Sequence, residues 1–241
     1  MDTWKRELSV LRALDLFCGA GGATKGLQRA GFHVTGVDIK AQPRYVGDKF
    51  LKGDALSLWP LHSFRFIWAS PPCQAHVRGL KNSPGYDRAN HVDLIDRTRD
   101  FLKRSRVPYV IENVPGAPIR PDIILDGTMF PELRVIRERW FETSWGELQL
   151  GRSSPPRGLL EKGYLSIAGT GIQKWCVDRG LRFTAQQARD AMGIDWMTRK
   201  ELSQAIPPAY SEFIGRAALT YINSDACGSI HVGKRQRPRH T

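Results

Sequence analysis

The sequence predicts an α/β fold in which a mostly parallel sheet is covered by helices on both faces. Short apolar runs bounded by turn residues alternate with helical stretches along the first half of the chain, which is the pattern of successive βαβ units. A glycine-rich turn joins the first apolar run to the first helical stretch. The chain has 241 residues, which is enough for one such domain with a small appended lobe.

The first βαβ unit contains the glycine-rich turn. We expect a strand, a helix and a second strand at residues 11–17, 24–30 and 34–38. The first strand leads into Gly19, Gly21 and Gly22, and Gly31 stands where a helix commonly ends in a left-handed glycine. The second strand ends in the carboxylate of Asp38.

The later elements follow from the same signals. We expect strands at residues 64–69 and 109–112 and a polar helix at residues 91–103. Thr184 and Thr198 each begin a capping box, because Gln187 and Glu201 follow three residues later. Pro208 is expected to open a last helix, since proline is tolerated in the first turn.

The chain divides into a main domain and two smaller parts. Residues 1–145 and 184–223 form the expected main domain, and the segment 146–183, rich in Gly, Ser, Pro and basic residues, is expected to be a small insert. The tail 224–241 is expected to be disordered. It ends in a basic cluster of Lys234, Arg235, Arg237 and Arg239.

The charge balance favours a polyanionic partner. Lys and Arg number 36 against 24 Asp and Glu, a net charge of +12, which suits nucleic acid but also a basic protein whose charge only aids solubility. The four cysteines lie far apart without a CxxC, so neither a zinc site nor a disulfide framework is expected. No signal peptide or long apolar run indicates secretion or a membrane span.

The glycine-rich turn is the first candidate site. Gly19, Gly21 and Gly22 let the backbone approach a ligand at the end of a strand, where open α/β sheets bind ligands. Asp38, at the end of the next strand, can accept hydrogen bonds from a ribose. These features fit a dinucleotide, an adenosyl group or a turn of purely structural role.

Cys73 is the candidate nucleophile. Pro71 and Pro72 stiffen the backbone after the strand at residues 64–69 and can present the thiol at the carboxyl end of the sheet. The ordinary pKa of a thiol is about 8.5, so nearby positive charge is needed to raise the thiolate fraction. Taken alone, a single cysteine is more often a buried apolar residue.

A carboxyl group and two arginines complete the candidate chemistry. Glu112 ends a strand at the same edge of the sheet and can donate a proton if it is partly desolvated. Arg137 and Arg139 alternate around Glu138 as in a strand, which would place both arginines on one face. Each of these charged residues, taken alone, fits an ordinary surface position. Their order along the chain, with each near a predicted strand end, favours a functional site over surface charges.

In this order the motifs resemble those of the DNA (cytosine-5) methyltransferase family, from residue 11 to about residue 218. The pair Pro-Cys-Gln and Glu-Asn-Val is highly specific, and the small size is similar to that of members from bacteriophages or prophages. The matching segments are Asp15-Leu16-Phe17-Cys18-Gly19-Ala20-Gly21-Gly22, Pro72-Cys73-Gln74, Glu112-Asn113-Val114, and Gly127-Thr128-Met129-Phe130 with Arg137-Glu138-Arg139.

The resemblance implies a Rossmann-like S-adenosylmethionine-dependent methyltransferase fold with a small inserted target-recognition lobe. It implies that Cys73 attacks carbon 6 of a flipped-out cytosine, that Glu112 holds or protonates ring nitrogen 3, and that Arg139, paired with Arg137, contacts the base carbonyl. The partner is then double-stranded DNA, with no metal and no membrane. We expect a monomer in the cytoplasm of a bacterial or phage-infected cell, where it protects DNA as in restriction–modification.

The resemblance also implies a cofactor site for S-adenosyl-L-methionine. Phe17 would lie against the adenine and the glycines against the amino-acid moiety, while Asp38 would bind the ribose and Asp54 the adenine amino group. The remaining residues of the implied site are Cys18, Gly19, Ala20, Gly21, Gly22, Ile39, Ala55, Pro72, Gln204 and Ala205.

Three departures from the family leave alternatives open. Ser203 and Gln204 stand where the family has Gly-Asn, Val135 replaces a glutamine, and the target-recognition insert is short. An RNA cytosine-5 methyltransferase is one alternative, although that branch's Cys-Phe-Thr motif is absent. A catalytically silent DNA-binding relative is another, against which Cys73 and Glu112 stand intact. A modified S-adenosylmethionine is compatible with the altered Ser203-Gln204 segment.

The short insert predicts limited sequence recognition. A small lobe can hold few base-reading side chains, so methylation mapping should give a site of roughly two to four base pairs. Because the other basic residues would contact phosphates, binding should weaken with salt at a log–log slope of about −0.9 per phosphate. A site of about six or more base pairs, or binding insensitive to salt, would contradict this. The basic residues are Arg152, Arg157, Lys162, Lys174, Arg179 and Arg182, against Glu147, Glu161 and Asp178.

Overall fold

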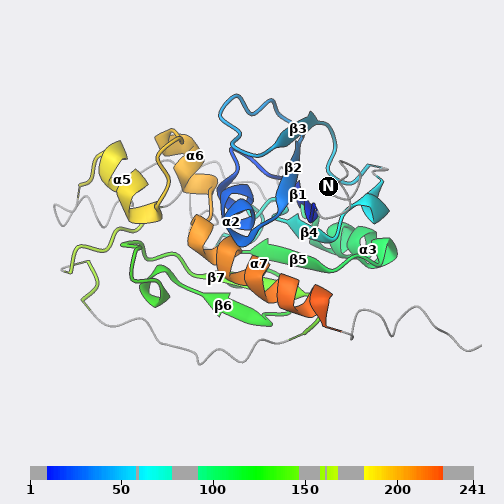
Figure 1. Ribbon diagram of the computed structural model, residues 1–241. Coiled ribbons are helices and arrows are strands. Elements are labelled where there is room, and N and C mark those ends of the chain that lie inside the picture. The colour runs from blue at the N-terminus through cyan, green and yellow to red at the C-terminus, as the bar shows by residue number, and fades with distance from the viewer. Residues whose placement is uncertain are drawn as a thin grey trace, which may run out of the picture.

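The computed structural model contains one seven-stranded sheet, seen in Figure 1. It describes residues 10–57, 60–77, 92–146, 158–160, 162–167 and 182–224. The strands are β1 Arg12–Leu16, β2 His33–Asp38, β3 Lys49–Lys52, β4 Phe66–Ala69, β5 Tyr109–Asn113, β6 Ile123–Leu125 and β7 Arg139–Thr143.

The strand order is β3-β2-β1-β4-β5-β7-β6. Strands β1 to β5 run parallel to one another, whereas β7 is antiparallel to both β5 and β6. The chain builds the sheet outward from β1 in one direction and then from β4 in the other. A crevice at the carboxyl ends of β1 and β4 follows from this reversal, and such crevices are where open α/β sheets bind ligands.

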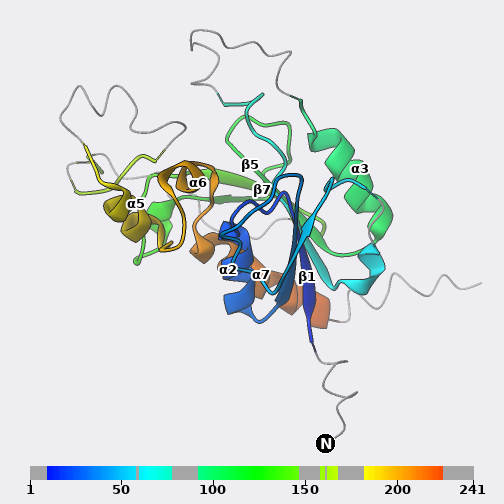
Figure 2. The ribbon, with the colours of Figure 1, turned by 90° about the horizontal axis from the view of Figure 1, so that it is seen from above.

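The helices form layers on both faces of the sheet, as the sequence predicts. Figures 1 and 2 show α2 and α7 on one face and α3 on the other, with α5 and α6 beyond the end of α7. The bounds are α2 Gly22–Ala30, α3 Ile95–Ser105, α5 Ala185–Met192, α6 Arg199–Gln204 and α7 Pro208–Asn223, with short 3-10 turns η1 Leu61–Ser63 and η3 Gly127–Met129.

The predicted helix boundaries are largely confirmed. Gly31 ends α2 with a φ of 106°, and Thr184 and Thr198 form the capping boxes that begin α5 and α6. Pro208 is the first residue of α7. The polar helix, expected from residue 91, begins only at Ile95, because Asp93 accepts a hydrogen bond from the Ile95 amide and holds the chain in a turn.

The strands were predicted less completely. The four expected strands form, but β3 and β6 were missed because they are short and lack a clean apolar alternation. The expected strand through both arginines was partly wrong. Strand β7 begins at Arg139, and Arg137 lies before it, in a segment that pairs at Val135 with Leu165.

Close helix packing on one face depends on two glycines. A Cβ on Gly26 of α2 would lie 2.0 Å from the Pro208 carbonyl oxygen, and one on Gly215 of α7 would lie 2.9 Å from the Ala30 Cβ. Neither position has room for a side chain, so α2 and α7 pack backbone against backbone. This contact holds the start of α7 beside the start of α2.

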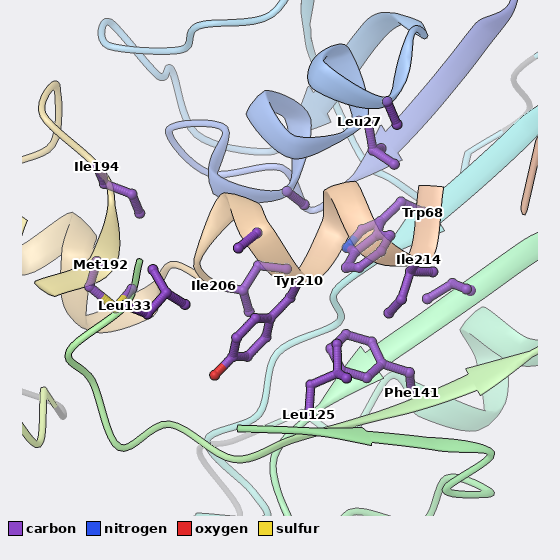
Figure 3. Close-up of a cluster of buried hydrophobic side chains, with 14 of the residues drawn as sticks. Leu27, Trp68, Leu125, Leu133, Phe141, Met192, Ile194, Ile206, Tyr210 and Ile214 are labelled. Carbon is purple, nitrogen blue, oxygen red and sulfur yellow. The ribbon is translucent and has the colours of Figure 1, made fainter. Parts of the chain in front are cut away.

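Two apolar clusters lie on the two faces of the sheet. The cluster shown in Figure 3 joins Trp68 and Phe141 of the sheet to Tyr210 and Ile214 of α7, and extends to Met192 at the end of α5. The other cluster packs Leu14 and Leu16 against α3. Alternate residues of β1 thus enter opposite cores, as a strand covered on both faces requires.

Part of the expected domain division lies outside the described residues. Most of the insert expected at 146–183, and all but Ser224 of the tail expected at 224–241, are in that part of the chain. In the described stretch 162–167, Ile167 packs into the core of the main domain, and Leu165 exchanges hydrogen bonds with Arg134 and Ile136.

The described residues contain neither a candidate membrane span nor a candidate metal-binding cluster. Within that part of the chain, no helix is both long and apolar enough to cross a membrane. Among the same residues, no group of three or more His, Cys, Asp or Glu side chains is placed to hold a metal ion.

A buried ion pair joins α3 to the antiparallel edge of the sheet. Glu142 of β7 has a side chain only 3% exposed, and it accepts hydrogen bonds from Arg99 of α3 at 2.8 and 2.9 Å and from the Arg120 amide at 3.0 Å. Burial alone would raise the pKa of Glu142, but these donors outweigh burial and lower it. The carboxylate is therefore ionised at neutral pH and depends on Arg99 for its counter-charge.

Replacing Arg99 with methionine should destabilise the fold. The Arg99→Met variant leaves a buried carboxylate without its cation, so the free energy of unfolding should fall by roughly 1–3 kcal/mol. Arg97→Met, on the exposed side of the same helix, is the matched control. Because the folded pKa of Glu142 is depressed, its contribution is present at neutral pH and lost as pH falls through that value. Denaturant titrations should show a weaker acid dependence in Arg99→Met, and equal stability of the two variants would contradict the assignment.

Candidate active site

A cavity of about 710 Å³ opens at the carboxyl ends of β1, β2, β4 and β5. It lies where the strand order reverses. All the site residues expected from the sequence line it except Gly21 and Arg137. The expected residues in its wall are Phe17, Cys18, Gly19, Ala20, Gly22, Asp38, Ile39, Asp54, Ala55, Pro72, Cys73, Glu112, Arg139, Gln204 and Ala205.

The glycine-rich turn leaves β1 in a left-handed conformation. Phe17, Gly19 and Gly21 have φ values of 62°, 50° and 89°. Gly19 and Gly21 adopt this region without steric cost, whereas Phe17 is in a region that non-glycine residues rarely enter and that is typical of functional sites. The indole of Trp196 donates to the Ala20 carbonyl at 2.8 Å and fixes the turn from the far end of the chain.

Two carboxylates extend the wall away from this turn. Asp38, after β2, accepts from the Gly19 amide at 3.0 Å through one oxygen and from the Lys40 amide at 2.9 Å through the other. Asp54 accepts from the Leu56 amide at 2.9 Å. Backbone donors therefore hold both carboxylates in place at the cavity, where each oxygen keeps further acceptor capacity.

Cys73 lies among three charged side chains at the other end of the cavity. Glu112 of β5 forms an ion pair with Arg139 of β7, with 3.0 Å between Oε1 and Nε. Burial raises the pKa of Cys73, and the negative charge of Glu112 raises it further, while Arg139 and Arg137 act in the opposite direction. In this state the thiol is protonated at neutral pH, and the charge of Glu112 controls how readily it ionises.

The loop that carries Cys73 is tied to β5. The Asn113 side chain donates to the Pro71 carbonyl at 3.0 Å, and Asn113 also accepts from the Val114 amide at 2.9 Å. After the thiol the chain turns, since the His76 amide donates to the Cys73 carbonyl at 2.8 Å. The Asn113 side chain therefore holds the loop that carries Cys73 in position beside β5. The chain from residue 78 to residue 91 lies outside the described residues.

Arg137 lies behind the cavity wall. Its side chain is buried and donates to the carbonyls of Ile167 at 2.7 Å and Ser203 at 2.9 Å. Tyr210 of α7 donates to the Arg137 carbonyl at 2.8 Å. Burial and the neighbouring charge of Arg139 lower the pKa of Arg137 to about 9, so the guanidinium stays charged at neutral pH. The two arginines therefore differ: Arg139 faces Glu112, and Arg137 joins the insert segment to the end of α6.

Ser203 and Gln204, which stand where the family has Gly-Asn, are the last two residues of α6, and the residues that follow them reach the glycine-rich turn. A Cβ on Gly22 would lie 2.7 Å from the Ile206 carbonyl oxygen and 3.3 Å from the Ala205 Cβ. Gly22 therefore has to be glycine for the segment to close over the start of α2. Gln204 is exposed beside the cavity, and the Ser203 carbonyl accepts from Arg137.

The sequence analysis missed an ion pair at the cavity wall. Arg44, in the loop after β2, donates its Nε to both oxygens of Glu201 in α6, at 2.8 and 3.1 Å. Glu201 had been recognised only as the capping partner of Thr198. No local pattern could have found the pair, because its members are 157 positions apart. Asp15 was also left without a role, although a charged residue within an apolar strand was a visible signal.

Neither a protein-family model nor the sequence of a curated protein matches this chain. Its fold matches solved structures of methyltransferases. The Dnmt2 methyltransferase of S. pombe matches with a TM-score of 0.55 at 15% identity, covering 89% of this chain and 100% of that one. The methyltransferase EhMeth of Entamoeba histolytica matches with a TM-score of 0.55 at 14% identity, covering 90% and 100%. The chain therefore has the Rossmann-like fold of S-adenosylmethionine-dependent methyltransferases.

The coupling between Glu112 and Cys73 is testable without substrate. In Glu112→Gln the charge that raises the thiol pKa is removed, so iodoacetamide should alkylate Cys73 faster at neutral pH than in the parent protein. Arg139→Met should react more slowly, because a cation that favours the thiolate is lost. The rate is followed against pH by mass spectrometry of the Cys73 peptide. Glu132→Gln, an exposed carboxylate, is the control. A thiol pKa that is unchanged or higher in Glu112→Gln would contradict the coupling.

Proposed function

We propose that this protein is a DNA (cytosine-5) methyltransferase that uses S-adenosylmethionine. The observation that carries the proposal is the ion pair of Glu112 with Arg139 beside the Cys73 thiol, in one cavity with the glycine-rich turn. A nucleophile, a proton donor for the ring and a cation for the base carbonyl are the groups needed to activate carbon 5 of cytosine.

The wall of the cavity fits S-adenosylmethionine. Gly19 leaves room for close backbone approach, and backbone donors hold the carboxylates of Asp38 and Asp54 at the cavity, where they can bind ribose hydroxyls and an adenine amino group. Phe17 immediately precedes the turn and lines the same cavity, where its ring can cover the adenine. The cofactor supplies a methyl group that its sulfonium makes electrophilic.

The side chains around Cys73 support attack on the ring. The Cys73 thiol loses its proton to solvent, and its sulfur forms a bond to carbon 6. The electron pair of the 5,6 double bond moves through the ring, and nitrogen 3 receives a proton from Glu112, which has taken that proton from solvent and is left ionised. Arg139 holds the base carbonyl and keeps Glu112 in register through their ion pair. Carbon 5 then becomes nucleophilic, as methyl transfer requires. Loss of the carbon-5 proton and departure of the Cys73 thiolate restore the double bond.

The thiol becomes reactive only when the base is in place. With Glu112 ionised, burial and its charge keep the pKa of Cys73 above the ordinary range. When Glu112 takes up a proton to hold nitrogen 3 of a bound cytosine, its charge no longer raises the pKa of Cys73, and the positive charges of Arg139 and Arg137 then favour the thiolate. This coupling restricts attack to the bound base and protects the thiol from other electrophiles.

The proposed substrate is a cytosine flipped out of duplex DNA. A stacked base cannot reach a cavity at the edge of the sheet, so it has to leave the helix at a cost of a few kcal/mol. The net charge of +12 supports a nucleic-acid partner. The Glu-Asn-Val and Pro-Cys-Gln motifs without a Cys-Phe-Thr motif favour DNA over RNA. A protein with this activity is proposed to act in the cytoplasm of a bacterial or phage-infected cell.

A mechanism-based substrate tests the proposal. A DNA duplex containing 5-fluorocytosine should form a covalent complex with the parent protein in the presence of S-adenosylmethionine, because fluorine at carbon 5 cannot leave as a proton. The Cys73→Ala variant should form none. Complexes are separated under denaturing conditions, and the adduct is located by mass spectrometry.

Two arms decide between the alternatives. The same sequence is presented as DNA and as RNA, and nucleoside mass spectrometry of an expression host without cytosine methylation identifies the transferred group. A complex that forms with Cys73→Ala, or a parent protein that traps neither substrate, would overturn the mechanism. Trapping of RNA alone would show an RNA methyltransferase.

A further inference from the structure

An ion pair that the proposed mechanism does not use joins two walls of the cavity. Arg44 lies in the loop after β2 and Glu201 in α6, and both residues line the cavity. The Arg44 Nε donates to both oxygens of the Glu201 carboxylate, at 2.8 and 3.1 Å. The two side chains are 45% and 19% exposed, so the pair lies at the solvent side of the cavity. It therefore bridges the opening between the loop after β2 and α6.

Both of these walls border the glycine-rich turn. The loop with Arg44 begins directly after Asp38, which accepts from the Gly19 amide at 3.0 Å. On the other wall, the segment after α6 packs on the start of α2, because a Cβ on Gly22 would lie 2.7 Å from the Ile206 carbonyl oxygen. The ion pair thus connects the two segments that flank the part of the cavity proposed to hold the cofactor.

The loop after β2 is fixed at its ends and exposed between them. Asp38 holds one end, and Tyr45 holds the other. A Cβ on Gly36 or Gly47 would lie 2.5 Å or less from the Tyr45 side chain, whose hydroxyl is 3.2 Å from that of Thr24. Residues 39–44 between these points are exposed, apart from one half-buried residue. The Arg44 side chain can therefore leave Glu201 while both ends of the loop stay in place.

Glu201 is the fixed member of the pair and Arg44 the movable one. Glu201 accepts from the amide and the hydroxyl of Thr198, each at 2.7 Å, as part of the capping box that begins α6. Burial alone would raise the pKa of Glu201, but the hydrogen bonds from Arg44 and Thr198 lower it to about 2, so its carboxylate is charged at neutral pH. A long, exposed arginine side chain has many rotamers, which makes opening of the pair a side-chain motion.

We propose that the Arg44–Glu201 pair bars the passage by which S-adenosylmethionine enters and leaves the cavity, so that the pair opens each time the cofactor exchanges. The inference rests on the proposed function, which supplies the cofactor. A barrier of this kind slows entry and exit by the same factor. It leaves the affinity unchanged, because a ligand that does not touch the pair favours neither its open nor its closed state. A contact with the bound cofactor would slow exit alone.

The rates of cofactor exchange test the barrier without DNA and without turnover. Surface plasmon resonance on the immobilised full chain gives the association and dissociation rate constants for S-adenosylmethionine. In Arg44→Met both rate constants should rise roughly two- to fivefold, the range that loss of one exposed ion pair allows. The Kd should stay within about twofold of the parent value. Arg216→Met, which removes the exposed pair of Arg216 with Glu212 on α7, is the matched control and should leave both rates unchanged.

A second variant tests the other member of the pair. Glu201→Gln retains the capping box, because glutamine serves at that position as glutamate does, and it should speed both rates as Arg44→Met does. The double variant should be no faster than either single variant, since one contact can be lost only once. Added salt should reduce the difference between the parent and Arg44→Met, because screening weakens an exposed ion pair.

The outcomes separate this inference from the proposed function. An association rate that does not rise in Arg44→Met and in Glu201→Gln would overturn the barrier and leave the methyltransferase intact. Failure of the parent to bind S-adenosylmethionine at all would overturn the proposed function itself, and the barrier with it.

Discussion

The reversal of strand order between β1 and β4 is the constraint on which the rest of this structure depends. Parallel strands end at the same edge of a sheet, and connections that leave that edge in opposite directions cannot fill the space between them. The turn after β1 and the loop that carries Cys73 after β4 therefore face one another. Asp38 and Glu112 reach the same cavity because β2 and β5 are the next strands outward. Phe17 at the start of the first turn and Glu112 of β5 are 95 positions apart in sequence, and the strand order alone brings both to this cavity.

Several ionisable groups at this edge of the sheet are buried or partly buried beside one another. Glu112 is balanced by Arg139, and Arg137 satisfies carbonyls of the insert and of α6 while its charge still acts on the thiol. At the other end of the cavity Asp15 has only like charges near it among the described residues. At both ends of the cavity burial raises the pKa of an acidic group, the thiol of Cys73 at one end and the carboxyl group of Asp15 at the other.

The packing of α2 and α7 on one face of the sheet explains how the cavity keeps its shape. Helix α7 lies against α2 through Gly26 and Gly215, and its Tyr210 reaches the Arg137 carbonyl from within the apolar cluster. The last helix therefore fixes the segment that precedes β7 and, through Arg137, the end of α6. Helix α7, more than 60 residues downstream of Arg137, thus helps to set the position of that arginine. This dependence is typical of a site built from loops on a rigid scaffold.

The sequence by itself determined the fold class and most of the cavity wall. Local signals were sufficient for the fold class, because the βαβ pattern, the glycine turn and the capping threonines each constrain the backbone within a few residues. Most residues of the cavity wall were expected from the resemblance to the methyltransferase family. The motif order also brought Cys73, Glu112 and Arg139 together as a hypothesis. Strands β3 and β6 escaped notice because short edge strands have little periodicity.

Only the tertiary structure decided which charges meet and which are left alone. Arg44 and Glu201, or Arg137 and the Ser203 carbonyl, are paired across long separations that no local pattern encodes. The separate positions of Arg137 and Arg139, and the Asp15 Oδ1 atom left without a hydrogen-bond partner among the described residues, likewise depend on burial, which is a property of the packed core as a whole. The energy of a charge is set by everything within several ångströms of it, and the sequence lists those neighbours only after the chain has folded.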